Sequence, residues 1–302
     1  MTVSTQRYLE AKRTVDDRAL DRRVLERFTA ELAGRATENE GVRIVELGAG
    51  VGTMIARLAA WGCLPDTVTY RAVDRDRESI AHARERLPSW LEDAGYDVES
   101  REEGILARKG DSRLEVTLEV ADVFEISGEA DAVIAAAFLD LIDLERALGS
   151  IGKLVVDSGV LYAPITYDGT TRFAPTHPLD DRVERLYHRH MEEIREVPGS
   201  SRAVRDLLEV LAESTYDVLA VGGSDWVVRP VDGSYPADER AFLTHLLGTI
   251  DDALADYPAG VLEPETRRRW TTDRRRRLEE NELVFVAGNL DVLARLDDRL
   301  PR

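Results

Sequence analysis

The chain has 302 residues, 43% of them hydrophobic, and its 58 acidic residues outnumber its 40 basic residues to give a formal net charge of −18. This length and apolar content allow a large buried core, either as one domain or as a core with an inserted cap. The negative charge argues against nucleic acid and anionic membranes as partners, because the long-range field of the protein repels them.

The sequence lacks the patterns of membrane spans, signal peptides, disulfides and metal sites. No apolar run approaches the roughly 20 residues that cross a bilayer, and the first residues lack the apolar core of a signal peptide. The single Cys63 cannot form an internal disulfide, and no Cys and His group has metal-ligand spacing. We therefore expect a cytoplasmic, metal-free protein that acts on a small molecule as a monomer or homodimer.

Lysine is nearly absent, at Lys12, Lys109 and Lys153 only, while arginine and aspartate abound. An acidic, lysine-poor surface resembles that of proteins from salt-accumulating archaea, in which high ionic strength screens the self-repulsion. The composition therefore predicts a halophilic protein. It carries no information about the reaction.

In chain order, the first predicted element is a helical arm from Thr5 to Thr37, with apolar residues at helical spacing. The charge-rich segment from Tyr8 to Leu20 allows the arm to break into two helices. A strand over 43–47 follows and ends in a turn that contains Gly48, Gly50 and Gly52, before a helix over 53–62. Glycines let the backbone approach a ligand closely, and the helix start offers free N–H groups, so this is a nucleotide-binding turn.

The next predicted strand, over 67–74, ends in Asp74, which stands 22 residues after Gly52. A carboxylate at that edge of a parallel sheet can accept both hydroxyls of a ribose. A third strand over 114–121 runs into Asp122 and Val123, and a fourth over 131–137 ends at Ala137. The strand ends therefore bring several polar groups to one edge of the sheet.

With these motifs, residues 42 to 166 resemble the class I S-adenosylmethionine (SAM) dependent methyltransferases. The resemblance implies SAM as the cofactor, with Asp122 at the adenine amino group and the end of the fourth strand beside the methyl group. The cofactor-binding residues it implies are Glu46, Gly48, Gly50, Gly52, Asp74, Asp122, Val123 and Ala137. It also implies that the helical arm lies over the cofactor pocket, as in many members of the family.

The remaining pattern alternates strands and helices, which predicts a parallel sheet with helices on both faces. The expected fold is therefore α/β, a doubly wound Rossmann-like methyltransferase sheet with an antiparallel last strand, a helical arm (1–37) and helical caps at about 167–200 and 236–281 within a domain over 38–302. Further elements are expected as a helix over 76–94, a hairpin over 99–112, a helix over 143–156, a strand over 159–166, helices over 180–195 and 201–214, strands over 217–221 and 225–228, helices over 237–257 and 263–280, and a strand over 283–290.

The segment from Tyr162 to Pro178 reads as a loop just past the fifth strand, where ligands bind in open α/β sheets. A hydroxyl acceptor needs a general base, and Tyr167, Asp168 and His177 in this loop are the candidate catalytic residues. The arginines favour a carboxylate or phosphate on the acceptor, and the aromatic residues would flank its apolar part. The substrate-binding candidates are Tyr8, Arg13, Arg18, Arg172 and Trp226.

The function we expect is SAM-dependent methyl transfer to an oxygen or nitrogen of a small polar metabolite. A SAM-binding regulatory or scaffold protein without turnover is the alternative. An NAD-dependent dehydrogenase fits less well because Thr53 stands where its third glycine belongs, and an aminopropyltransferase fits less well because Ala135, Ala136 and Ala137 stand where it needs acidic residues. Asp140 is the nearest substitute for those acids.

The excess of acidic residues predicts that stability rises with salt. Ionic strength from roughly 0.1 to 2 M shortens the Debye length from about 10 to 2 Å and so screens the repulsion between exposed carboxylates. The melting temperature, followed by circular dichroism across that range of potassium chloride, should rise. A flat profile would contradict the charge argument.

Overall fold

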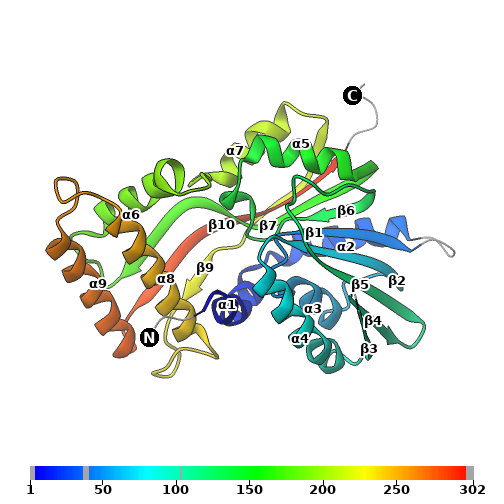
Figure 1. Cartoon of the computed structure of the whole chain (residues 1–302), viewed down its shortest axis with the longest axis horizontal. Helices are drawn as coiled ribbons and strands as arrows, with labels where there is room; N and C mark the ends of the chain where they lie inside the picture. The colour runs from blue at the N-terminus through cyan, green and yellow to red at the C-terminus, as the bar shows by residue number, and fades with distance from the viewer. Residues whose placement is uncertain (1–3, 37–40, 103, 297–302) are drawn as a thin grey trace.

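The computed structural model describes residues 4–36, 41–102 and 104–296. These residues form an α/β structure around a ten-stranded mixed sheet with the strand order β3-β4-β5-β2-β1-β6-β7-β10-β8, and β9 pairs with β10 outside this path (Figure 1). The parallel centre consists of β5 (Ser112–Val120), β2 (Thr67–Asp74), β1 (Val42–Leu47), β6 (Ala130–Ile134) and the first part of β7 (Val155–Ala174). The hairpin of β3 (Asp97–Arg101) and β4 (Gly104–Lys109) extends the edge beyond β5, as predicted.

Helices cover both faces of this central sheet. One buried cluster joins the sheet to α2 (Arg22–Arg35), α3 (Thr53–Ala60) and α4 (Arg77–Asp93). A second cluster joins the other face to α5 (Leu144–Leu154) and α7 (Ala203–Ala212). The predicted doubly wound fold is thus confirmed. None of the helices in the described ranges is long and apolar enough to cross a membrane.

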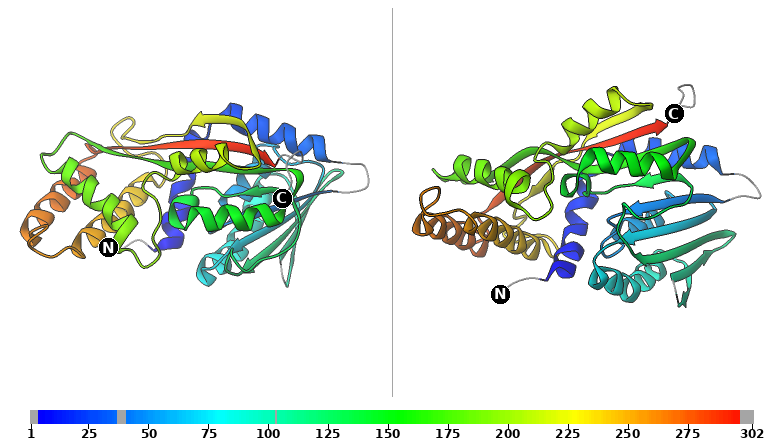
Figure 2. Two further views of the ribbon diagram at one scale, coloured as in Figure 1. Left: turned by 90° about the horizontal axis from the view of Figure 1, so that it is seen from above. Right: turned by 45° about the horizontal axis from the view of Figure 1, so that its top comes forward.

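The last strand, β10 (Val284–Leu296), pairs antiparallel with β7, with β8 (Tyr216–Gly223) and with β9 (Trp226–Val228). The predicted antiparallel last strand is confirmed. Both β7 and β10 extend beyond the central sheet. Their outer parts lie beside three helices, α6 (Asp180–Arg189), α8 (Glu239–Ala255) and α9 (Pro264–Glu279) (Figures 1 and 2). We call these three helices with β9 and the outer parts of β7 and β10 the cap, and a third buried cluster fills it.

The prediction of a loop between Tyr162 and Pro178 is wrong, because β7 continues as a strand to Ala174. Its outer part pairs with β10, and Tyr167 lies opposite Asn289 while Phe173 lies opposite Phe285. Proline, glycine and polar residues made this stretch look like a loop. The pairing tolerates them through shifts in the strand register between β7 and β10.

The helical arm breaks in two, as its charge pattern allowed. Helix α1 (Thr5–Ala19) ends at Leu20, and Asp21 begins α2 by accepting hydrogen bonds from the backbone N–H groups of Arg23 and Val24. Figure 2 shows α1 between the central sheet and the cap, whereas α2 lies on the face of the sheet. The break therefore sends the two halves of the arm to different surfaces.

The packing of α2 on the sheet can be tested at Phe28. Its fully buried ring stacks on Tyr162, with 4.5 Å between ring centroids. We expect Phe28→Ala to lower the free energy of unfolding by about 3–5 kcal/mol, because the cavity left behind adds to the lost burial. Urea denaturation in high salt measures this. Val221→Ala, at a side chain that is 41% exposed, should change stability by less than about 0.5 kcal/mol.

Candidate functional site

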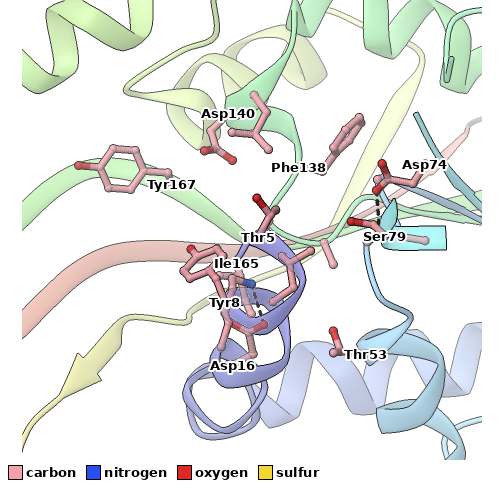
Figure 3. A pocket seen from close by; sticks show the side chains of 18 of the residues that line it. Thr5, Tyr8, Asp16, Thr53, Asp74, Ser79, Phe138, Asp140, Ile165 and Tyr167 are labelled. Atoms are coloured by element: carbon pink, nitrogen blue, oxygen red, sulfur yellow. Dashed lines mark hydrogen bonds and ion pairs between the residues drawn. The ribbon is translucent and has the colours of Figure 1, made fainter. Parts of the chain in front are cut away.

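A cavity of about 540 Å³ opens at the carboxyl ends of the parallel strands, between the central sheet, α1 and the cap (Figure 3). The segments that follow β1, β2, β5 and β6 all contribute to its wall. Helix α1 contributes one face, through Thr5, Tyr8, Leu9, Lys12 and Asp16. Its size lies in the range of small-molecule and cofactor sites.

The glycine turn after β1 forms one wall of the cavity through Gly48 and Gly50. Both adopt positive φ angles, of 67° and 54°. A Cβ on Gly48 would lie 2.2 Å from the ring of Phe138, so no other residue fits there. The turn therefore brings bare backbone to the cavity.

Gly52 is the exception among the predicted glycines, because it is not part of the cavity lining. It has a φ of 81° and begins α3, and a Cβ there would contact Leu87 and Ala83 of α4. Its role is therefore to start the helix, and we withdraw it as a cofactor contact.

Asp74 ties the glycine turn to the end of β2. One of its carboxylate oxygens accepts a hydrogen bond from the Gly50 N–H and the other accepts one from the Asp76 N–H, each at 2.8 Å. A carboxylate has about four lone-pair sites, so both oxygens can still accept from a ligand. The cavity lining also includes Asp122, Val123 and Ala137, and the structure thus brings together all the predicted cofactor residues except Gly52.

Glu46 lies beneath this turn with only 2% of its surface exposed. The Tyr70 hydroxyl donates a hydrogen bond of 2.7 Å to its carboxylate. Burial raises the pKa of Glu46 to about 8, although the Tyr70 hydrogen bond and the charge of Arg57 oppose the shift. The glutamate is therefore substantially protonated near neutral pH.

Arg57 of α3 is a cavity residue that the sequence analysis missed. It is 2% exposed, and its Nε donates to Asp17 at 2.6 Å while its Nη2 lies 3.8 Å from Asp16. These contacts fasten α1 to the helix that follows the glycine turn. The signal was present, because Arg57 is the only charged residue in the apolar run from Met54 to Ala60.

The inner end of the cavity lies between α1 and the cap. Lys12 and Asp16 form an ion pair of 2.7 Å, and the Trp226 indole N–H donates to Asp16 at 3.0 Å. Tyr8 stacks on His245 of α8, with ring centroids 4.3 Å apart. The structure thus brings Tyr8 and Trp226, two of the predicted substrate residues, into the cavity wall.

Tyr167 is the one predicted catalytic residue in the cavity wall. Its hydroxyl lies 2.8 Å from His188 Nε2 and 2.6 Å from Thr171 Oγ1. Burial raises the pKa of Tyr167 and lowers the pKa of His188. Both shifts favour the neutral forms, so the pair is suited to holding a polar group in place.

The other two catalytic candidates lie outside the cavity lining. Because neighbouring side chains of a strand point to opposite faces, Asp168 turns away from the side that Tyr167 occupies, and it accepts a hydrogen bond from the Thr170 N–H. His177 lies beyond the end of β7, where its Nδ1 accepts from the Leu179 N–H. We therefore no longer expect either to act on a substrate.

The three arginines predicted to bind substrate also lie outside the lining. Arg13 lies over the Trp90 ring, 5.1 Å from its centroid. Arg18 pairs with Glu239, and Arg172 pairs with Glu184. The prediction counted their charges as free, whereas the fold uses them to join α1 to α8 and β7 to α6.

Asp140, in the short η1 turn (Leu139–Leu141) after β6, does line the cavity. Burial raises the pKa of its carboxyl, and the charges of Arg195 and Lys12 oppose the shift. No other residue in the described ranges donates a hydrogen bond to this carboxylate. The acidic residue that follows the fourth parallel strand is thus directed to the site.

No protein-family model matches the chain, and no curated protein matches it. Solved structures are similar over most of its length. A putative methyltransferase from Bacillus halodurans has 12% identity and a TM-score of 0.48, over 89% of this chain and 98% of its own. A SAM-dependent methyltransferase from Geobacter sulfurreducens, in complex with S-adenosyl-L-homocysteine, has 14% identity and a TM-score of 0.46, over 100% and 99%.

The cyclase SpnF has 15% identity and a TM-score of 0.43, over 90% of this chain and 81% of its own. These three likenesses combine low identity with TM-scores below 0.5. The function must therefore be argued from the residues of this chain.

The buried Glu46 predicts a pH-dependent stability. The folded protein keeps a proton that the unfolded chain releases, so the free energy of unfolding falls as pH rises from 4.5 to about 8 and levels off above. We expect Glu46→Gln to flatten this decline, because the amide has no proton to lose. Urea denaturation at pH 5 and pH 8 measures it, with the exposed Glu92→Gln as control. An equally steep decline in Glu46→Gln would contradict the assignment.

Proposed function

We propose that the protein transfers a methyl group from SAM to an oxygen or nitrogen of a small polar metabolite. The observation that carries the proposal is the grouping of the glycine turn, Asp74 and Asp122 around one cavity at the carboxyl ends of neighbouring parallel strands. This is where open α/β sheets bind nucleotide-like ligands. The sequence resemblance to class I methyltransferases supports the same cofactor.

The residues present fit the cofactor. The turn at Gly48 and Gly50 presents backbone without side chains, packed closely against Phe138 and Leu9, which also line the cavity. Asp74 keeps acceptor capacity for the ribose hydroxyls, and Asp122 stands at the end of β5 for the adenine amino group. When bound, SAM supplies an activated methyl group, and the protein mainly positions the acceptor and excludes water. Helix α1 serves the second task, because it covers the inner end of the cavity.

A second candidate is aminopropyl transfer, which the position of Asp140 favours. That reaction shares the cofactor-binding logic and needs acidic residues after the fourth parallel strand, and Asp140 lines the cavity there. The products separate the two. Methyl transfer releases S-adenosylhomocysteine, whereas aminopropyl transfer releases methylthioadenosine. Neither product would form in a SAM-binding regulatory protein.

Cofactor binding is tested at Asp74. We expect Asp74→Ala to weaken S-adenosylhomocysteine binding by about 1–3 kcal/mol, because the ribose hydroxyls lose a charged acceptor. Isothermal titration calorimetry in high salt measures the affinity. Asp74→Asn should lose less, since its amide oxygen still accepts one hydrogen bond. Asp97→Ala, at an exposed position that begins β3, is the matched control. Unchanged affinity in Asp74→Ala would remove this residue from the site.

A further inference from the structure

The inner end of the cavity holds a carboxylate, that of Asp140, to which no other residue in the described ranges donates a hydrogen bond. Figure 3 shows Asp140 on the same side of the cavity as Tyr167, with Tyr8 across from it. Asp140 is partly buried, and a carboxylate that is partly withdrawn from water is stabilised by a hydrogen-bond donor. A ligand is the partner that the cavity can still supply.

The cations near Asp140 are already engaged with the protein. Lys12 is held by Asp16, which also accepts the Trp226 indole N–H. Arg195 donates to the backbone carbonyls of Val197 at 2.8 Å and of Asp140 at 3.3 Å. Arg195 thus braces the backbone that carries Asp140. The Asp140 carboxylate can therefore still accept a hydrogen bond, and a positively charged donor suits it best.

The walls beside Asp140 are aromatic. Tyr8, Tyr167, Tyr187 and Trp226 all line the cavity, and Asp140 lies near enough to Tyr8 and Tyr187 to affect their ionisation. The faces of tyrosine and tryptophan rings attract ammonium groups. An anionic acceptor at Asp140 would face a carboxylate and two cations that are already engaged, Lys12 with Asp16 and Arg195 with backbone carbonyls.

We propose that the methyl acceptor is an amine, whose nitrogen donates a hydrogen bond to Asp140 and packs against the neighbouring aromatic rings. This inference rests on the proposed methyl transfer. It replaces the expectation, drawn from the arginines in the sequence, of a carboxylate or phosphate on the acceptor.

The reaction balances with groups at hand. The bound ammonium loses one proton, and the lone pair of its nitrogen then forms the new N–C bond as the C–S bond of the cofactor breaks and its electron pair stays on sulfur. Asp140 is positioned to accept that proton and pass it to solvent. Burial raises the pKa of Asp140, and this suits a carboxylate that accepts a proton.

The test uses two shape-matched series, each of an amine, an alcohol and a carboxylate: benzylamine, benzyl alcohol and benzoate, and butylamine, butanol and butyrate. Each probe is titrated into the full-length protein by calorimetry, with and without saturating S-adenosylhomocysteine. The variants are Asp140→Asn, which keeps shape and removes charge, and the control Asp181→Asn, at an exposed residue of α6. The affinity for S-adenosylhomocysteine is measured on each protein to verify its fold and cofactor site.

We expect at least one amine to bind roughly ten-fold or more tightly than its alcohol and its carboxylate. Asp140→Asn should lower the affinity for that amine by about ten-fold or more, because it loses a hydrogen bond between two charged groups. The affinities for the alcohol and for S-adenosylhomocysteine should not change. Asp181→Asn should match the parent protein.

Two results would overturn the inference: no amine binds better than its matched alcohol, or the preferred amine binds equally well to Asp140→Asn. A parent protein that fails to bind S-adenosylhomocysteine contradicts the proposed function instead. The titrations without cofactor then still decide whether Asp140 recognises an amine.

Discussion

The buried carboxylate of Asp291 holds together the three segments on which the site depends. It lies on β10 and accepts hydrogen bonds from the Ile165 N–H of β7 at 2.8 Å and from the Asp21 N–H, where α1 gives way to α2, at 2.9 Å. Ile165 has a φ of 56°, which a β-branched residue rarely adopts. Burial raises the pKa of Asp291 to about 6. One side chain therefore fixes the irregular point on β7, the break in the arm and the shift of register on β10.

The contacts of Asp291 position α1 and the cap on either side of the cavity. Helix α1 crosses between the central sheet and the cap (Figure 2), and Arg57 fastens it to the core through Asp17. On its other side the rings of Tyr8 and His245 join it to the cap. The glycine turn alone would leave an open cleft at the strand ends. The arm converts that cleft into a chamber with one polar cofactor end and one aromatic inner end.

The central sheet could be predicted from the sequence because short local patterns determine its strands and turns. Strand ends, glycines and acidic residues occur at a spacing that only a parallel sheet explains, and the structure gathers Asp74 and Asp122 as expected. Long-range pairing decides the rest. The outer part of β7 is a strand because β10 lies beside it. Neighbouring side chains of a strand point to opposite faces, so Tyr167 lines the cavity and Asp168 does not. Arg18 and Arg172 are occupied by Glu239 and Glu184, residues distant in sequence or on another element, and no local pattern reveals those partners.

The difference between exposed and buried ion pairs explains how so acidic a chain can keep a well-ordered site. Salt screens exposed ion pairs within a few ångströms, and surface pairs such as Arg101 with Glu99 contribute little in any case. The pairs that shape the chamber are different, because Lys12 and Arg57 both pair with Asp16, and all three side chains are largely withdrawn from solvent. Ions from the solvent reach such pairs poorly. High salt can thus relieve the repulsion over the surface while the arm stays fastened over the cavity, and the position of Asp140 opposite α1 depends on those contacts.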